Sequence, residues 1–255
     1  MIKSINIILK KCLNVKGHES VLIVTDSKLY NLAVGLFYQA AKIAKKVKLV
    51  TIPIPKVNGT EPPKGIAKEM LKHDAGIFIT TKSLSHTNAR INASKNGARV
   101  VTMPGITKHI LKRAIDIDYK KLQKLHKKLA DIMDKGKKAE ITTKLGTKLA
   151  FNIKGRKSYG RDTGLFVKKG AFGNLPTGEI FIAPVEKTAN GIYIVDASFE
   201  SIGKLKSPLK IYVKNGYANK IKGRDAKKLE NLLNPLGKRQ ETLRNSASEP
   251  TIRQK

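Results

Sequence analysis

Short apolar runs alternate with helical stretches through the first half of this chain, and that alternation constrains the fold more than any other feature. Each run is rich in Val, Ile, Leu or Ala, which is typical of a buried strand. The runs are Val21–Val24, Val47–Val50, Ala75–Ile79 and Ala98–Val101. Helices are expected around and between them, over residues 5–13, 29–45, 65–72 and 87–95. Strands separated by helices form a mainly parallel sheet covered on both faces, so the sequence predicts an α/β fold.

The second half of the chain opens with a basic amphipathic helix and continues as short strands and turns. The helix is predicted over residues 118–134, with leucine and isoleucine on one side and lysine elsewhere. A hairpin is expected over Glu140–Ile153, and Asn215-Gly216 is the signal of a tight β-turn. We therefore predict an α/β domain at residues 1–136 and a β-rich domain at residues 137–238.

The charge of the chain argues for a different class of function. Lys and Arg number 51 against 19 Asp and Glu, a net charge of +32, which is common in proteins that bind nucleic acid. The basic residues are spread along the whole chain, and aromatic residues make up only 5%, too few for a base-stacking platform. We favour a solvated basic surface and keep a nucleic-acid-binding or scaffold protein without catalysis as the alternative.

Composition also limits the compartment and the kinds of site. Because Cys12 is the single cysteine, the sequence excludes an internal disulfide framework and a multi-cysteine zinc site, and we expect Cys12 to be a buried helical residue. No run of eighteen apolar residues is present, and the N-terminus resembles an amphipathic helix more than a signal peptide. These features predict a cytoplasmic protein that does not enter a membrane.

Two carboxylates occupy unusual positions in a chain so poor in acid. Residues 173–186 are expected to form a loop that places Glu179 before a short apolar strand and Glu186 just after it. Glu179 is therefore the first residue that we suspect of chemistry. An exposed glutamate after a turn is the ordinary alternative, since glutamate is seldom buried.

The same loop resembles a known family. Its sequence, Gly173-Asn174-Leu175-Pro176-Thr177-Gly178-Glu179, is similar to the signature of the aminopeptidase T or leucyl aminopeptidase family of metal-dependent exopeptidases. Weaker matches are Ser85-His86-Thr87, Gly97-Ala98-Arg99, Met103-Pro104-Gly105-Ile106-Thr107 and Arg161-Asp162-Thr163-Gly164. The resemblance extends to about Gly237 and implies a thermophilic-type metallo-aminopeptidase that removes N-terminal residues from peptides.

The resemblance also implies site residues, cofactors and partners. It assigns Glu179 to a metal-ligand position and gives Glu186 a weaker substrate-side role, with Asp196 in a matching segment; it identifies no catalytic residue. Intact members hold divalent metal ions, two of the Zn, Co or Mn class, which activate a water molecule for attack on the peptide carbonyl. A peptide substrate and a homodimer are the implied partners.

The sequence departs from the family after residue 238. Residues 239–255 lack an apolar period and are predicted to be a disordered tail, whereas the family continues there with further metal ligands. Reading the codons from Arg239 one nucleotide back permits a translation that contains the missing Glu-Phe-Gly-Ile-Gly-Thr-Asn motif. We therefore interpret the second domain as incomplete and the tail as out of frame, and expect a truncated chain that lacks most metal ligands.

Overall fold

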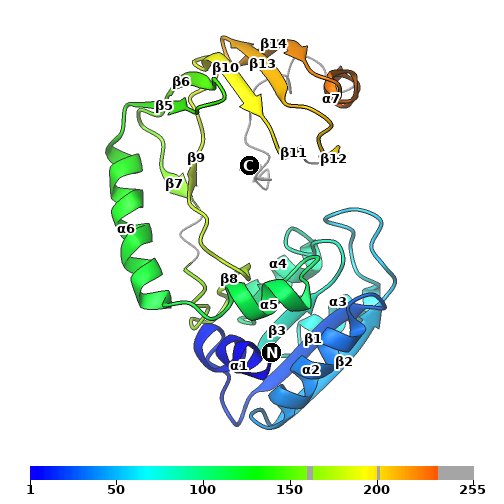
Figure 1. The fold of residues 1–255 in the computed structure, drawn as a ribbon. Coiled ribbons are helices and arrows are strands. Elements are labelled where there is room, and N and C mark those ends of the chain that lie inside the picture. The colour runs from blue at the N-terminus through cyan, green and yellow to red at the C-terminus, as the bar shows by residue number, and fades with distance from the viewer. Residues whose placement is uncertain (160–162, 200–201, 235–255) are drawn as a thin grey trace. The chain divides into compact units, whose positions relative to one another are not determined.

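The computed structural model describes residues 1–159, 163–199 and 202–234 of the chain (Figure 1). These residues form two compact units, which are described separately. Unit 1 comprises Met1–His126 and residues 163–179; unit 2 comprises residues 127–159, 180–199 and 202–234. The chain passes from unit 1 to unit 2 within helix α6, between His126 and Lys127, and residues 163–179 belong with unit 1 although they follow part of unit 2.

Some sequence-based predictions concern residues outside the described ranges. The Arg161-Asp162 pair of the family resemblance and the tail at 239–255 lie there. The assignment of domains at 1–136 and 137–238 stays a prediction.

Unit 1 contains a five-stranded parallel sheet in the order β2-β1-β3-β4-β8. Its strands are β1 (Ser20–Asp26), β2 (Lys46–Ile52), β3 (Ala75–Ile79), β4 (Arg99–Thr102) and β8 (Phe172–Asn174). The first four overlap the apolar runs of the sequence, whose β-branched side chains suit a strand buried on both faces. The fifth comes from much later in the chain and pairs with β4.

Helices cover both faces of this sheet, as Figure 1 shows. They are α1 (Ile2–Ile7), the π-helical turn η1 (Ile8–Cys12), α2 (Tyr30–Ala41), α3 (Lys64–Met70), α4 (Asn88–Lys95), α5 (Lys108–Ala114) and the start of α6 (Tyr119–Lys135). Side chains alternate along β1, so Val21 and Ile23 join the core beneath α1, η1 and α2, whereas Leu22 and Val24 join the core beneath α3 and α4. Cys12 is buried in the first of these cores.

Unit 2 contains a five-stranded antiparallel sheet in the order β14-β13-β10-β6-β5. Its strands are β5 (Lys138–Thr142), β6 (Lys148–Asn152), β10 (Asn190–Val195), β13 (Leu209–Lys214) and β14 (Tyr217–Lys222). Two short ladders pair β7 (Ser158–Tyr159) with β9 (Phe181–Ile182), and β11 (Ser198–Phe199) with β12 (Gly203–Lys204). The unit ends with α7 (Ala226–Leu233), whose Leu229 packs on the sheet core with Leu209 and Ile211.

The predicted fold class is confirmed: a mainly parallel sheet covered by helices is followed by a β-rich part. The hairpin of β5 and β6 and the Asn215-Gly216 turn between β13 and β14 lie where the sequence predicts them. One helix was missed. Helix α5 begins at the cap Thr107, whose side-chain oxygen accepts a hydrogen bond from the Ile110 backbone N–H at 3.1 Å. A capping threonine before a mostly basic stretch was the available signal.

The interpretation of residues 173–186 as a loop is wrong at its start. Gly173 and Asn174 belong to β8, where they lie opposite Val101 and Thr102 of β4 in a parallel ladder. The backbone groups of this polar segment are thus paired within the sheet. Pairing with a strand so distant in sequence leaves no mark in the local pattern, because a three-residue strand has too few positions to show a period of two.

Candidate functional site

Four strands of unit 1 end in, or lead directly into, polar residues at one edge of the sheet. Asp26 and Thr102 are the last residues of β1 and β4, Thr80 follows β3, and Asn174 ends β8. Because these strands are parallel, their carboxyl ends meet at the same edge. The direction in which successive strands are added to the sheet changes at β1, because β2 lies on one side of β1 and β3 lies on the other side. In open α/β sheets, ligands bind outside the carboxyl ends of the strands at such a reversal.

A hydroxyl network joins β4 and β8 at this edge. Ser85 Oγ and Thr102 Oγ1 both lie within hydrogen-bonding distance of Oδ1 of Asn174, the former at 3.0 Å. Ser83 Oγ donates to Ser85 Oγ at 2.8 Å. Ser85 and Thr102 are 2% and 1% exposed, whereas Asn174 is exposed. Ser85 Oγ and Thr102 Oγ1 also lie 2.8 Å from each other, so their two protons are shared between this contact and Oδ1 of Asn174. At least one of the two hydroxyls donates to Oδ1, which fixes the carbonyl side of the Asn174 amide toward the network.

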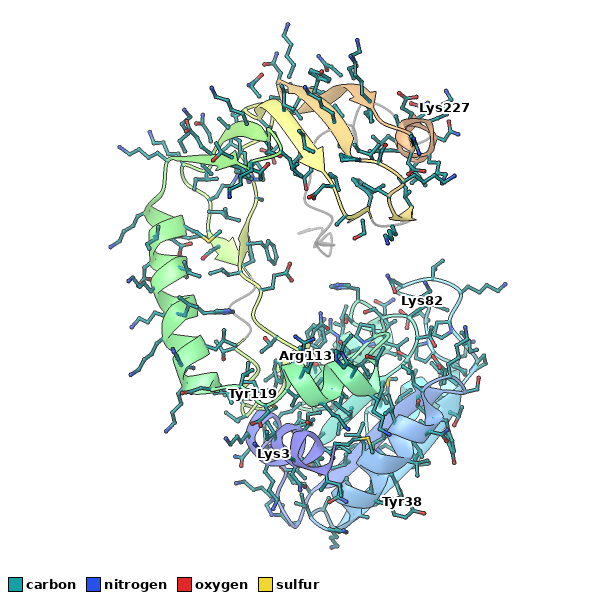
Figure 2. The ribbon with its side chains drawn as sticks, in the orientation of Figure 1. Lys3, Tyr38, Lys82, Arg113, Tyr119 and Lys227 are labelled. Atoms are coloured by element: carbon teal, nitrogen blue, oxygen red, sulfur yellow. The ribbon has the colours of Figure 1, made fainter. Side chains whose placement is uncertain are left out.

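Asp26 links the ends of β1 and β3. Its side chain is completely buried, with Oδ2 accepting a hydrogen bond from the Thr81 backbone N–H at 2.5 Å and Oδ1 accepting one from the Lys28 backbone N–H at 3.1 Å. Thr80 Oγ1 donates to the carbonyl oxygen of Lys82 at 2.6 Å. Figure 2 labels Lys82 in this region, after the end of β3. The loops at this edge are therefore held by side-chain hydrogen bonds to backbone groups.

Helix α4 begins beside the same edge and is capped twice. Thr87 Oγ1 accepts from the backbone N–H of Arg90 at 3.2 Å. Glu61 accepts from the backbone N–H groups of Asn88 at 2.5 Å and Ala89 at 3.2 Å. A carboxylate at a helix N-terminus is stabilised by the unpaired N–H groups there. Glu61 thus ties the preceding loop to α4.

Arg90 and His86 supply the titratable groups of the site. The Arg90 Nε–H donates to the carbonyl oxygen of Ser85 at 2.6 Å, and the guanidinium lies 3.8 Å from the centroid of the Phe172 ring. Burial lowers the pKa of Arg90 to about 10, so it remains charged at neutral pH. Burial, and then the charge of Arg90, lower the pKa of His86 from its ordinary value, which favours the neutral imidazole at neutral pH.

The two carboxylates singled out in the sequence lie in different units. Glu179 is an exposed residue at the end of unit 1, after the cis Leu175-Pro176 bond and a glycine, Gly178, with φ of +124°. Glu186 is an exposed residue of unit 2 and forms an ion pair with Arg156. Each is consistent with an ordinary surface glutamate.

Sequence reasoning missed several residues of the sheet edge. Asp26, Thr102 and Arg90 were not proposed, and Ser85, His86 and Asn174 entered only as parts of a family resemblance. A signal for the first two was present, because Thr102 directly follows a run of buried apolar residues and Asp26 follows such a run after one threonine, Thr25. The contact between Arg90 and Phe172 had no such signal, since it depends on β8 pairing beside β4.

The metal expected from the sequence finds no ready site in the described structure. Within residues 1–159, 163–199 and 202–234, no three His, Cys, Asp or Glu side chains form a group that could hold a metal ion. Transition-metal sites in enzymes combine several such ligands with an open position. The residues described here therefore do not fit a metal centre. No helix among them is long and apolar enough to span a membrane.

Several solved structures are similar to this chain, among them the following two. The first, a 2,5-dihydroxypyridine dioxygenase from Pseudomonas putida KT2440, matches with a TM-score of 0.71 and 16% identity over 91% of this chain and 70% of that chain. The second, wild-type AmpT from Thermus thermophilus, matches with a TM-score of 0.62 and 14% identity over 91% of this chain and 74% of that chain. Both likenesses show the fold. A search of curated proteins found no match.

The family model described as NicX, 2,5-dihydroxypyridine 5,6-dioxygenase, matches residues 1–241. This match corrects the aminopeptidase assignment and, with it, the expected peptide substrate and hydrolase activity. The alternative of a nucleic-acid-binding protein without catalysis also receives no support. The broader expectation of an enzyme is confirmed, and a metal cofactor agrees with the family, whereas the paired Zn, Co or Mn ions followed from the aminopeptidase resemblance alone. With a family model covering nearly its whole length, the chain belongs to the NicX family.

Proposed function

We propose that this chain binds 2,5-dihydroxypyridine, or a ring closely related to it, and takes part in its oxidative ring cleavage. The single observation that carries the proposal is the match of the family model to residues 1–241. The structural likeness to a dioxygenase of the same description supports it at the level of the fold. The substrate is then a flat, hydroxylated nitrogen heterocycle.

The proposed reaction adds both atoms of O2 to the substrate and breaks the bond between ring atoms 5 and 6. Oxygen chemistry of this type is supplied by a cofactor, for which non-haem iron is one recognised class. Because the described residues do not fit a metal centre, we assign no step to a metal. The roles that we propose for this chain's residues are binding and orientation of the ring.

The sheet edge of unit 1 offers groups for those roles. Asn174 is exposed there, and its amide is oriented by the buried hydroxyls of Ser85 and Thr102. We propose that Asn174 contacts a hydroxyl group of the ring, with Ser85 and Thr102 acting as positioning residues. An amide held in one orientation binds with a smaller entropic cost than a freely rotating one.

The test separates binding from turnover. Isothermal titration of the full chain with 2,5-dihydroxypyridine, without oxygen, should show saturable binding that Asn174→Ala weakens by about 5- to 10-fold, as expected for the loss of one hydrogen bond. Asn219→Ala is the matched control, because Asn219 is an exposed asparagine of unit 2. Absence of binding to the unaltered chain would refute the proposal.

Turnover is measured as oxygen uptake and loss of the ultraviolet absorbance of the ring, after ferrous iron is supplied. One mole of O2 should disappear for each mole of substrate, because a dioxygenase places both oxygen atoms in the product. Substrate loss without oxygen uptake, or binding with no turnover at all, would contradict the catalytic part of the proposal.

Glu179 remains our candidate for a metal ligand. Its carboxylate is exposed at the end of unit 1, and an oxygen ligand of this type suits several divalent metals. A single carboxylate is not a metal site, so the prediction requires further ligands from outside the described residues. We do not extend a substrate-side role to Glu186, whose carboxylate is already paired with Arg156.

A further inference from the structure

Arg90 is a half-buried cation without an ion-pair partner among the described residues. Within the part of the chain that the structure describes, no Asp or Glu forms an ion pair with its guanidinium. Glu61, which lies near in the fold, accepts from the Asn88 and Ala89 backbone N–H groups instead. The buried Arg99 shows the usual arrangement, since its guanidinium lies 2.6 Å from the carboxylate of Glu19.

The guanidinium of Arg90 is nevertheless held in a defined orientation. Its Nε–H donates to Ser85 O at 2.6 Å, and its plane is supported by the ring of Phe172 at 3.8 Å. The Nε–H group donates this hydrogen bond, whereas no acceptor among the described residues is hydrogen-bonded to the two Nη groups. A guanidinium fixed on one edge presents its remaining N–H groups as a fork that matches the geometry of an oxyanion.

Burial of Arg90 also has an energetic cost, which its described surroundings offset only in part. Desolvation lowers its pKa to about 10, which means that the protein environment disfavours the charged form. An adjacent anionic group would restore the charge interaction that burial removes. Stacking on Phe172 provides a part of the compensation, because cation–π contacts of partly buried arginines are favourable.

We infer that the Nη edge of Arg90 binds an anionic oxygen group carried by a flat ring ligand, and so selects ionised rings over neutral ones. The inference rests on the proposed function for the choice of a hydroxylated heterocycle. Two sources of the anion share this chemistry: an ionised ring hydroxyl and a ring carboxylate. Arg90 comes from α4 and Phe172 from β8, so the ligand would lie where these elements meet at the sheet edge.

The experiment is a titration of the full chain with three ligands: 2,5-dihydroxypyridine, 5-hydroxypyridine-2-carboxylate and the neutral 3-methoxypyridine. Arg90→Met should weaken binding of the two ligands that can carry an anionic oxygen, 2,5-dihydroxypyridine and the carboxylate, by about 10- to 100-fold and leave the neutral ligand unchanged, as expected for hydrogen bonds to a charged group. Arg90→Lys keeps the positive charge but not the forked arrangement of N–H groups, and should bind the anionic oxygen several-fold more weakly than the unaltered chain. Arg113→Met is the matched control, because Arg113 is an exposed arginine of α5 that Figure 2 labels.

The outcomes separate this inference from the proposed function. Binding of 2,5-dihydroxypyridine that is equal in the unaltered chain and in Arg90→Met would overturn the inference and leave the proposed function standing. Binding of the carboxylate alone, lost in Arg90→Met, would support the inference and refute the proposed substrate. If no anionic ring binds to the unaltered chain, the inference is wrong. If urea denaturation shows that Arg90→Met is not folded, Arg90→Lys takes its place. Unchanged affinity of Arg90→Lys for the ring ligands, compared with the unaltered chain, would then overturn the inference.

Discussion

Replacing Gly191 with alanine should unfold unit 2 selectively and so test whether the candidate site belongs to unit 1 alone. Gly191 lies in β10, the central strand of the antiparallel sheet, with φ of +130°. A Cβ atom at this position would lie 2.0 Å from the carbonyl oxygen of Lys148 and 3.1 Å from Cα of Leu149. Both are backbone atoms of β6, so the pairing of β10 with β6 must open.

The expected cost is the sum of two effects. A backbone conformation that L-residues rarely adopt costs about 1–3 kcal/mol, and overpacking against a rigid strand costs about 1–3 kcal/mol more. Gly191→Ala should thus destabilise unit 2 by about 2–6 kcal/mol. Gly203→Ala is the matched control, because Gly203 also has positive φ, of +83°, but no atom lies within 4 Å of its added Cβ. Gly203→Ala should therefore lower the stability of unit 2 only by the cost of backbone strain, about 1–2 kcal/mol.

Native-state hydrogen exchange, followed by mass spectrometry of peptides, measures the two units separately. In Gly191→Ala, peptides of β6, β10 and β13 should exchange roughly 30-fold faster or more, whereas peptides of β1, β3 and β4 should be unchanged. The affinity for the ring ligand should also be unchanged. Equal exchange in Gly191→Ala and Gly203→Ala would refute the steric argument, and loss of ligand affinity with unit 1 intact would refute a site confined to unit 1.

Three further predictions concern carboxylates and a histidine. Asp26→Asn should lower the free energy of unfolding by about 1–3 kcal/mol in urea titrations, because the new amide N–H would face one of two backbone donors; an unchanged stability would contradict the role of this buried carboxylate. Because the pKa of His86 is lowered in the folded state, its contribution is present above its ordinary value near 6.5 and is lost as pH falls below that value, so His86→Gln should flatten the stability profile in this window. Glu179→Gln should weaken binding of ferrous or manganous ion in calorimetric titrations compared with Glu230→Gln, and equal affinity would remove Glu179 as a ligand.

The architecture of unit 1 was predictable where local sequence determines it. The runs at β1, β2, β3 and β4 are apolar and β-branched, and the sheet buries them on both faces, so their composition alone indicates strands. The β8 strand was not predictable in this way. It is short, it includes a glycine and an asparagine, and its backbone is held in the sheet by pairing with β4.

The site was predictable only in part, for the same reason. Polar residues at the ends of apolar strands, such as Asp26 and Thr102, can be recognised in the sequence, because parallel strands bring such residues to one edge. Arg90 and Phe172 cannot be paired from the sequence, since their contact depends on β8. Glu179 drew attention because acids are rare in this chain, and rarity alone does not distinguish a ligand from an exposed turn residue.

The family assignment failed at the level of chemistry while the fold was right. The loop ending in Glu179 and the matches before it describe how a chain of this fold is arranged, and both similar structures share that fold over 91% of this chain. A fold hosts different reactions when the groups at its site differ. The family model, which weighs residues 1–241 together, therefore carries more information about activity than one motif.

The position of Arg90 gives the sheet edge a further property. The ring of Phe172 packs against the guanidinium of Arg90, and Oδ1 of Asn174 in the same strand accepts hydrogen bonds from the network of Ser85 and Thr102. Strand β8 therefore contributes both to the surroundings of Arg90 and to the hydroxyl network. A ligand bound between Arg90 and Asn174 would contact α4 and β8 together, and would favour the paired state of β8 by a factor of one plus the ratio of its concentration to its dissociation constant. A ligand whose binding weakens on loss of this pairing would therefore be expected to protect the β8 backbone amides from hydrogen exchange.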